Sequence, residues 1–306
     1  MYEAIERNVR GTWLLVAGFV LVVVALGYVF SELTGLGPVG VAAAAALAGA
    51  GAWGSYYSSD RIVLSISGAR QAPRDRYPYL HNAVEGLAIA AGLPVPRLYV
   101  IDDTAPNAFA TGRDPQHAAI AVTTGLLEKL DRLELEGVIA HEMAHIQHFD
   151  IRLATVAAVM VGLVALLSDW LLRRLRWGRR RGSRSGGAGG VLVLAGLVLA
   201  VLAPLVAHLL RLAISRRREY LADASGAMLT RYPEGLASAL EKISADPEPL
   251  EVANKATAHL YIVNPLREWG GWLNGLFDTH PPVEDRIRRL RTMVEGGELL
   301  PRGQSV

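Results

Sequence analysis

His141-Glu142-Met143-Ala144-His145 has the H-E-x-x-H pattern of a zinc-binding helix. Asp131 with Glu134 three residues later forms a capping-box pattern, which predicts a helix that runs through His148. Residues four apart lie on one helix face, so both imidazoles can reach one ion. Glu142 lies about 100° round the helix, where its carboxylate can accept a proton from metal-bound water.

A catalytic zinc site needs a third protein ligand and an open fourth position. His148 is near, but three histidines along one straight helix face cannot converge on one ion, so we expect it at a solvent-exposed rim. Glu219 and Asp223 lie four apart on another predicted helix. Glu219 can ligate zinc, and Asp223 can accept the other ring N–H of a ligand histidine. The alternative is an ordinary solvated helix face, which we favour less because the pair accompanies the H-E-x-x-H motif.

Two further segments are candidates for the substrate side of the site. His280 precedes a stiff Pro-Pro pair and can donate to an oxyanion, with Arg286 facing the same region. The alternative for His280 is a surface histidine without a role. Residues 107–112 predict a strand of small residues, and an edge strand can pair with a substrate backbone. We expect the substrate contacts at this strand at the following residues: Asn107, Ala108, Phe109 and Ala110.

The composition predicts a membrane protein. Hydrophobic residues make up 51% of the 306 residues and charged residues only 20%, below the usual quarter of a soluble domain. The absence of cysteine excludes disulfides, cysteine zinc sites and thiol catalysis. Stretches of about 20 apolar residues can cross a bilayer. Four such candidates occur: Trp13–Phe30, Leu36–Tyr57, Leu153–Leu172 and Val191–Leu210. The first is interpreted as a retained anchor, and the second is expected to pack against it through small residues.

The last two apolar stretches leave the topology open. Glu142 and Glu219 must meet, so the segments flanking these stretches lie on one side of the membrane. Two full crossings would then put the linker of residues 173–190, with its seven arginines, on the opposite side. The positive-inside rule disfavours that arrangement, because short loops rich in arginine usually stay on the cytoplasmic side. Either the two stretches form a hairpin that only dips into the membrane, or the first pair sets the orientation and the loop is carried across.

The remaining pattern predicts a mixed domain interrupted by apolar segments. We expect an N-terminal hairpin (1–57), two parts of the catalytic domain (58–152 and 211–306) and a second hydrophobic hairpin with a basic loop (153–210). Strands are expected at Arg61–Ser65, Arg97–Ile101, Asn107–Thr111 and Ala118–Thr123. Further helices are expected at Tyr79–Ala91, Arg216–Thr230, Pro233–Ser244, Leu250–Val263 and Pro282–Val294.

Five segments resemble, in order and spacing, the HtpX-type membrane metallopeptidases, relatives of the CAAX prenyl endoprotease: Asn107–Gly112, Ala118–Leu127, Glu134–Asp150, Glu219–Ala227 and Thr279–Ile287. The resemblance implies an integral-membrane α+β protein with up to four transmembrane or membrane-embedded helices. Its gluzincin-like domain, mostly helical with a small β-sheet, would face the cytoplasm from the cell membrane. The resemblance also implies one Zn²⁺ at His141, His145 and Glu219, with Glu142 as general base and acid.

The implied activity is a zinc endopeptidase that cleaves misfolded or damaged membrane proteins. The expected partners are polypeptides and the lipid bilayer, with no nucleic acid, while the oligomeric state is not indicated. A non-catalytic scaffold is a rival, but Glu142 would then have no role, and a structural zinc site has four protein ligands. A transporter is disfavoured because few ionisable residues lie within the apolar runs. An exopeptidase stays open.

Overall fold

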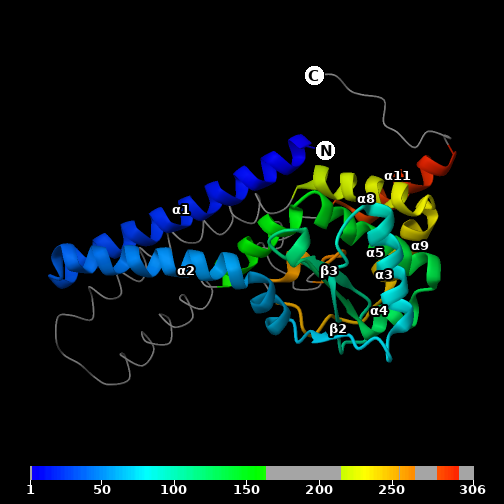
Figure 1. Cartoon of the computed structure of the whole chain (residues 1–306), viewed down its shortest axis with the longest axis horizontal. Coiled ribbons are helices and arrows are strands. Elements are labelled where there is room, and N and C mark those ends of the chain that lie inside the picture. Colours follow the sequence, from blue (N-terminus) through cyan, green and yellow to red (C-terminus); the bar gives the residue numbers. More distant parts are fainter. Residues whose placement is uncertain (1, 163–214, 255, 266–280, 296–306) are drawn as a thin grey trace.

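The computed structural model describes residues 2–162, 215–254, 256–265 and 281–295 and contains a long two-helix hairpin that projects from a mixed α/β domain (Figure 1). The hairpin is formed by α1 (Tyr2–Thr34) and α2 (Gly37–Ile66). Both helices are long and apolar enough to cross a membrane. Large apolar side chains such as Leu21 and Leu47 lie exposed on them, which suits contact with lipid rather than water. The first predicted span lies within α1, and the second lies in α2 apart from Leu36, which precedes the helix.

Small residues bring the two hairpin helices together. Gly35 and Gly37 have φ of +71° and +56° at the turn, a conformation that glycine adopts without strain. Further along, a Cβ on Gly27 would lie 2.1 Å from the Cβ of Ala44. The predicted close packing through small residues is thus confirmed.

The end of α2 corrects one prediction. Residues 61–65 were expected as a strand, but they continue α2 as its last turns. There α2 leaves the exposed part of the hairpin, and Val63 and Leu64 become buried in the domain beside Ile101 and Phe109. Local β-branched character was outweighed by continuation of an existing helix onto an apolar surface.

A four-stranded sheet, in the order β1-β2-β4-β3, forms one layer of the domain. Its strands are β1 (Arg70–Gln71), β2 (Arg97–Ile101), β3 (Ala108–Thr111) and β4 (Ala119–Thr123). β2 and β4 are parallel, whereas the other two pairs are antiparallel. The three longer strands were predicted, and β3 is the predicted edge strand. Every residue of β3 and β4 is buried, because elements cover both faces of the sheet.

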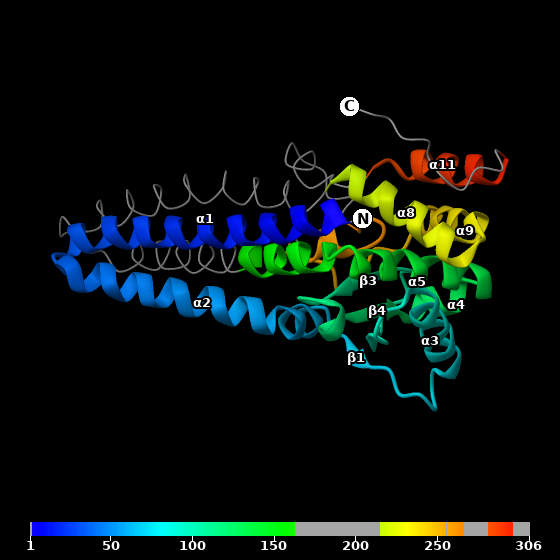
Figure 2. The same cartoon turned by 45° about the horizontal axis from the view of Figure 1, so that its top comes forward.

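Helices form the second layer, as Figure 2 shows. They are α3 (Pro78–Ala91), α4 (Thr124–Lys129), α5 (Arg132–Gln147), α8 (Arg216–Thr230), α9 (Pro233–Ala245) and α11 (Val283–Glu295). α5 lies centrally, in contact with α3, α8, α9 and β3. Its predicted capping box is confirmed, because Glu134 N donates to Asp131 Oδ1 at 3.0 Å and Asp131 N donates to Glu134 Oε2 at 2.9 Å.

Glycines allow the helices that flank α5 to approach its backbone. A Cβ on Gly226 of α8 would lie 2.9 Å from the backbone nitrogen of His141. A Cβ on Gly137 of α5 would lie 2.6 Å from the backbone nitrogen of Leu236 in α9. α5 and α8 carry the motif histidines and Glu219, so the short separation at Gly226 sets how closely the predicted ligands meet.

Two later segments differ from, or extend, what the sequence predicted. Residues 250–263 are not a helix: turns lead to the 3-10 helix η2 (Ala258–Leu260), followed by extended residues. The described part of the third apolar stretch lies in a helix that begins at residue 150. This helix is separated from α5 by a turn in which Phe149 has a φ of +60°. The part up to residue 162 packs on α1 (Figure 2). The rest of that stretch and all of the fourth lie outside the described residues.

Candidate metal centre

Three side chains from two helices converge on one point, and their geometry fits a metal ion. Nε2 of His141 and Nε2 of His145 face each other at 3.1 Å. The Glu219 carboxylate lies 3.5 Å from the His145 nitrogen and 3.8 Å from the His141 nitrogen. Tetrahedral bonds of 2.0–2.1 Å separate ligand atoms by about 3.3 Å. Within the described residues these three are the one group of histidine and acidic side chains placed to hold an ion.

Asp223 and Arg286 hold the first histidine from behind. Asp223 Oδ1 lies 2.9 Å from His141 Nδ1, the contact predicted from the spacing of Glu219 and Asp223. Burial lowers the pKa of His141 to about 4, so its ring stays neutral and can ligate a metal. Burial raises the pKa of Asp223, but the Arg286 charge and the hydrogen bonds from His141 and Arg286 together outweigh burial and hold the pKa below its ordinary value.

The second histidine is held by a residue that was not predicted. His145 Nδ1 donates to Asp150 Oδ2 at 3.0 Å. Burial lowers the pKa of His145. The hydrogen bond to Asp150 and the charge of Glu219 raise it by more than burial lowers it, so that the pKa is about 9. A metal ion must therefore displace a proton from this ring. Asp150 lies five residues after His145 in sequence, beyond the end of α5, and that spacing was the available signal.

Glu142 lines the same pocket as the three metal-facing side chains but is not one of the group placed to hold the ion. Its carboxyl is 2% exposed, and burial raises its pKa to about 7. The backbone N–H of Ala110 in β3 donates to it. A carboxyl whose pKa lies near neutrality can take up and release a proton at working pH.

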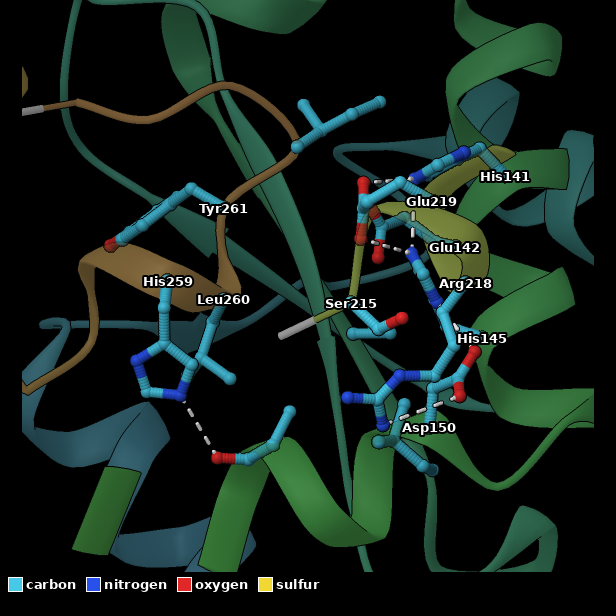
Figure 3. Close-up of a pocket in the computed structure, with 14 residues that line it drawn as sticks. His141, Glu142, His145, Asp150, Ser215, Arg218, Glu219, His259, Leu260 and Tyr261 are labelled. Carbon is cyan, nitrogen blue, oxygen red and sulfur yellow. Dashed lines mark hydrogen bonds and ion pairs between the residues drawn. The ribbon is translucent and has the colours of Figure 1, made fainter. Parts of the chain in front are cut away.

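The site opens into a pocket whose far wall is η2 and the residues that follow it (Figure 3). Ala110 lines one side of this pocket, and His259, Leu260 and Tyr261 line the other. Ile262 N donates to Ala108 O at 3.0 Å, so this segment lies along the edge of β3. Sequence reasoning missed this wall because it predicted a helix here.

The other predicted site residues lie as follows. Asn107 donates from Nδ2 to Val263 O at 3.0 Å, and Phe109 packs edge-to-face on Tyr261. Arg286 is fully buried and donates to Asp223 at 2.7 and 2.9 Å, while its predicted substrate contact stays a prediction. His280 lies outside the described residues. The prediction of a solvent-exposed His148 is wrong: it is 3% exposed because α1 covers it.

Comparison with known proteins gives the family. The sequence profile of peptidase family M48 matches residues 74–294. A protease HtpX homolog of Dictyoglomus thermophilum is 52% identical over 299 residues, which are 98% of this chain and 97% of that protein. A protease HtpX homolog of Thermoanaerobacter pseudethanolicus is 47% identical over 297 residues, covering 96% and 98%.

Among solved structures, the crystal structure of S. mikatae Ste24p aligns with a TM-score of 0.43 and 21% identity, over 78% of this chain and 55% of that chain. The family match covers both helices that carry the metal-facing side chains. The chain therefore belongs to peptidase family M48 and is a metallopeptidase.

Proposed function

We propose that this metallopeptidase is a zinc-dependent endopeptidase that cleaves misfolded or damaged membrane proteins at the cytoplasmic face of the cell membrane. One observation carries the proposal: the His141, His145 and Glu219 side chains converge in the same pocket as the Glu142 carboxylate. A non-catalytic scaffold would have no use for a buried carboxyl beside the metal position.

Zinc is the metal that this donor set suits best. Two imidazoles and one carboxylate are the ligands of many catalytic zinc sites, which keep a fourth position open. Such an ion, when bound, polarises a carbonyl group and lowers the pKa of a coordinated water. His141 and His145 would hold it through Nε2, since their Nδ1 atoms face Asp223 and Asp150.

The chain's own residues then move the proton. Glu142 takes a proton from the attacking water and delivers it to the leaving amine, a role for which a pKa near 7 is suited. The N–H of Ala110 fixes the carboxyl for that transfer. His280 is proposed as the donor to the oxyanion. Arg286 positions Asp223 and adds positive charge behind the site, 3.8 Å from the Glu219 carboxylate.

The edge of β3 is proposed as the place where the substrate backbone lies. Thr123 N donates to Asn107 O, so Asn107 and Phe109 direct their peptide groups toward β4. The peptide groups of Ala108 and Ala110 therefore face away from the sheet. Ala108 O already accepts from Ile262 N and the Ala110 N–H donates to Glu142, so the substrate backbone is proposed to pair at the carbonyl of Ala110, which lines the pocket. Main-chain pairing there would give affinity with little dependence on side chains, as a protease acting on damaged proteins requires.

The hairpin supports a location at the membrane. Trp13, Trp53 and Tyr57 lie exposed near the domain end of the hairpin, where an aromatic belt marks the membrane surface. Arginines follow on the domain side of this belt, including Arg10 and Arg61, which favours the cytoplasm for the domain. The metal-facing residues then lie close under the membrane, within reach of locally unfolded membrane proteins.

The test uses liposomes that contain the full-length enzyme and a membrane protein in two forms, native and destabilised by a core substitution. We expect cleavage of the destabilised form only, by wild type and not by Glu142→Gln. Internal fragments identified by mass spectrometry would establish an endopeptidase. Stepwise loss of terminal residues would favour an exopeptidase, and equal cleavage of both forms would contradict the quality-control role.

A further inference from the structure

Asn8 is a buried polar residue near the start of the membrane helix α1. Asn8 is only 3% exposed, although it lies in the polar first turns of α1, beside Arg7 and Arg10, before the apolar run begins at Trp13. It lies five residues before the exposed Trp13, about 8 Å along the helix axis. A buried amide costs free energy unless its hydrogen bonds are made. The partners of Asn8 therefore indicate its role.

Within the described part of the chain, the hydrogen-bond partners of this side chain belong to the metal centre or its immediate support. Nδ2 of Asn8 donates to Asp150 Oδ1 at 2.6 Å and to the carbonyl of His148 at 2.9 Å. Its Oδ1 accepts from Arg218 Nη1 at 3.2 Å. His148 ends α5, and Arg218 directly precedes Glu219 in α8. One amide from the membrane hairpin thus joins both helices that carry the metal-facing side chains.

The bond to Asp150 leads directly to a metal-facing histidine. One carboxylate oxygen of Asp150 accepts from Asn8, and the other accepts from His145 Nδ1 at 3.0 Å. Asp150 is 6% exposed, and its two carboxylate oxygens link the Asn8 amide of α1 to the imidazole of His145. Hydrogen bonds to the carboxylate behind a metal ligand fix the orientation of the ligand ring.

Packing on either side makes this contact part of a continuous interface. Gly11 lies one turn along α1, and a Cβ there would be 3.6 Å from Leu153 of the helix that follows Asp150. Beyond it, Leu15 and Phe19 pack against Leu153 and Val156 in one buried cluster. α1 is thereby docked along the helix of residues 150–162, and Asn8 is the polar contact at its domain end.

We propose that Asn8 is a positioning residue of the metal centre: it holds Asp150 against the ring of His145, so that the orientation of a metal ligand depends on the docking of a membrane helix. This inference rests on the proposed zinc site. It means that a displacement of α1 in the bilayer withdraws the support of His145 without any change in the ligands themselves.

The test exchanges the two side chains in the full-length protein in lipid nanodiscs. Asn8→Asp places a second carboxylate against Asp150, whereas the double variant Asn8→Asp/Asp150→Asn restores one carboxylate and one amide. In the double variant Asn at 150 can still accept from His145 and donate to Asp at 8, which faces Arg218. Thr12→Val is the matched control, because Thr12 is buried one turn further along α1 and, among the residues that the structure describes, its hydroxyl bonds only to Asn8 O, at 2.9 Å.

The readouts are the zinc dissociation constant, measured by competition with a chromophoric chelator, and the visible absorption spectrum of the Co²⁺-substituted protein. Loss of support behind a metal ligand typically weakens binding about 10–100-fold. We expect a loss in that range for Asn8→Asp with an altered Co²⁺ spectrum, and about a tenfold loss for Asn8→Ala. The double variant should recover part of the binding, because the bond between positions 8 and 150 is restored while the bond to the His148 carbonyl is not. Thr12→Val should match wild type.

The outcomes separate this inference from the proposed function. If wild type itself binds no zinc, the proposed function fails. If wild type binds zinc and every Asn8 variant keeps the same affinity and spectrum, Asn8 is a structural anchor only and the inference is wrong. A double variant as weak as Asn8→Asp would contradict it as well. If Asn8→Ala does not fold, the exchange variant still decides.

Discussion

Arg286 and Asp223 form a fully buried two-point ion pair behind the metal centre, with Nη2 2.7 Å from Oδ1 and Nε 2.9 Å from Oδ2. The pair joins α11 to α8, and Asp223 in turn faces His141 Nδ1. Arg286 Nη1 also donates to the carbonyl of Ile262 at 2.8 Å, which holds the pocket wall. One arginine thus ties the last described helix, a ligand support and the wall of the pocket together.

Removal of one partner of this pair should be severe. Arg286→Met keeps the volume but leaves the Asp223 carboxylate buried without its cation, which typically costs about 3–5 kcal/mol. We expect a large drop in thermal unfolding midpoint and in bound zinc. Arg286→Lys should recover only part, because an ammonium cannot make both bonds. Arg288→Ala is the control, because Arg288 lies exposed in the same helix and pairs with Asp285 there. An unfolding midpoint of Arg286→Met equal to that of wild type would contradict the stabilising role of this ion pair.

The close approach of α5 and α8 at Gly226 gives a second prediction. A Cβ there meets the backbone of His141 at 2.9 Å, so Gly226→Ala must push the two helices apart. Overpacking of this kind costs about 1–3 kcal/mol and should also weaken zinc binding. Gly86→Ala in α3, where a Cβ meets nothing within 4 Å, should instead stabilise slightly. If the unfolding midpoints of Gly226→Ala and Gly86→Ala shifted in the same direction, α5 and α8 would not be limited by their packing at Gly226.

Zinc binding should release a proton. The pKa of His145 in the metal-free site is about 9, raised above its ordinary 6.5, so the ring is protonated at neutral pH. Because the metal displaces that proton, zinc affinity should rise about tenfold per pH unit up to about pH 9 and then level off. Calorimetry at pH 7.5 in two buffers of different ionisation enthalpy should report about one proton released per zinc. An affinity independent of pH between 6.5 and 8.5 would show that His145 is neutral before binding.

The same raised pKa has a consequence for stability without metal. A protonated His145 pairs with Asp150 and Glu219 in the folded state, so its contribution is fully present below pH 6.5. It is lost as the pH rises through about 9. We expect the thermal midpoint of the metal-free protein to fall over that range more in wild type than in His145→Gln. Parallel pH profiles of the two proteins would argue against this linkage.

The membrane orientation can be tested by labelling, because the chain contains no cysteine of its own. Leu36 lies exposed at the tip of the hairpin, and Arg76 lies exposed in the domain, so Leu36→Cys and Arg76→Cys each provide one accessible thiol. In intact cells an impermeant maleimide should label position 36 only, and permeabilisation should expose position 76. Labelling of position 76 in intact cells would place the domain outside.

Local patterns account for the parts of the fold that the sequence predicts well. The capping box at Asp131 and the H-E-x-x-H spacing lie within one helix, so short-range rules were sufficient for α5. Glu219 and Asp223 could be matched to the same site because they also lie one turn apart. The strand of residues 97–101 was predicted with the bounds that β2 has.

Contacts between distant residues explain what the sequence did not predict. Asn8 meets Asp150 across 142 positions, and nothing in its neighbourhood marks it as part of a metal centre. Residues 250–263 carry apolar spacing that fits a helix, but Tyr261 is extended and packs on Phe109 of β3, and Ile262 N donates to Ala108 O of the same strand. Ile62 and Val63 have strand-like side chains, yet they continue α2. Tertiary packing outweighed local preference in each case.

The most direct test of the account measures zinc per chain and casein cleavage together, in wild type, Glu142→Gln and Glu219→Gln purified alike. We expect one zinc and cleavage in wild type, one zinc without cleavage in Glu142→Gln, and loss of both in Glu219→Gln. Glu142→Gln that cleaves casein as fast as wild type, or Glu219→Gln that keeps its zinc and its activity, would contradict it.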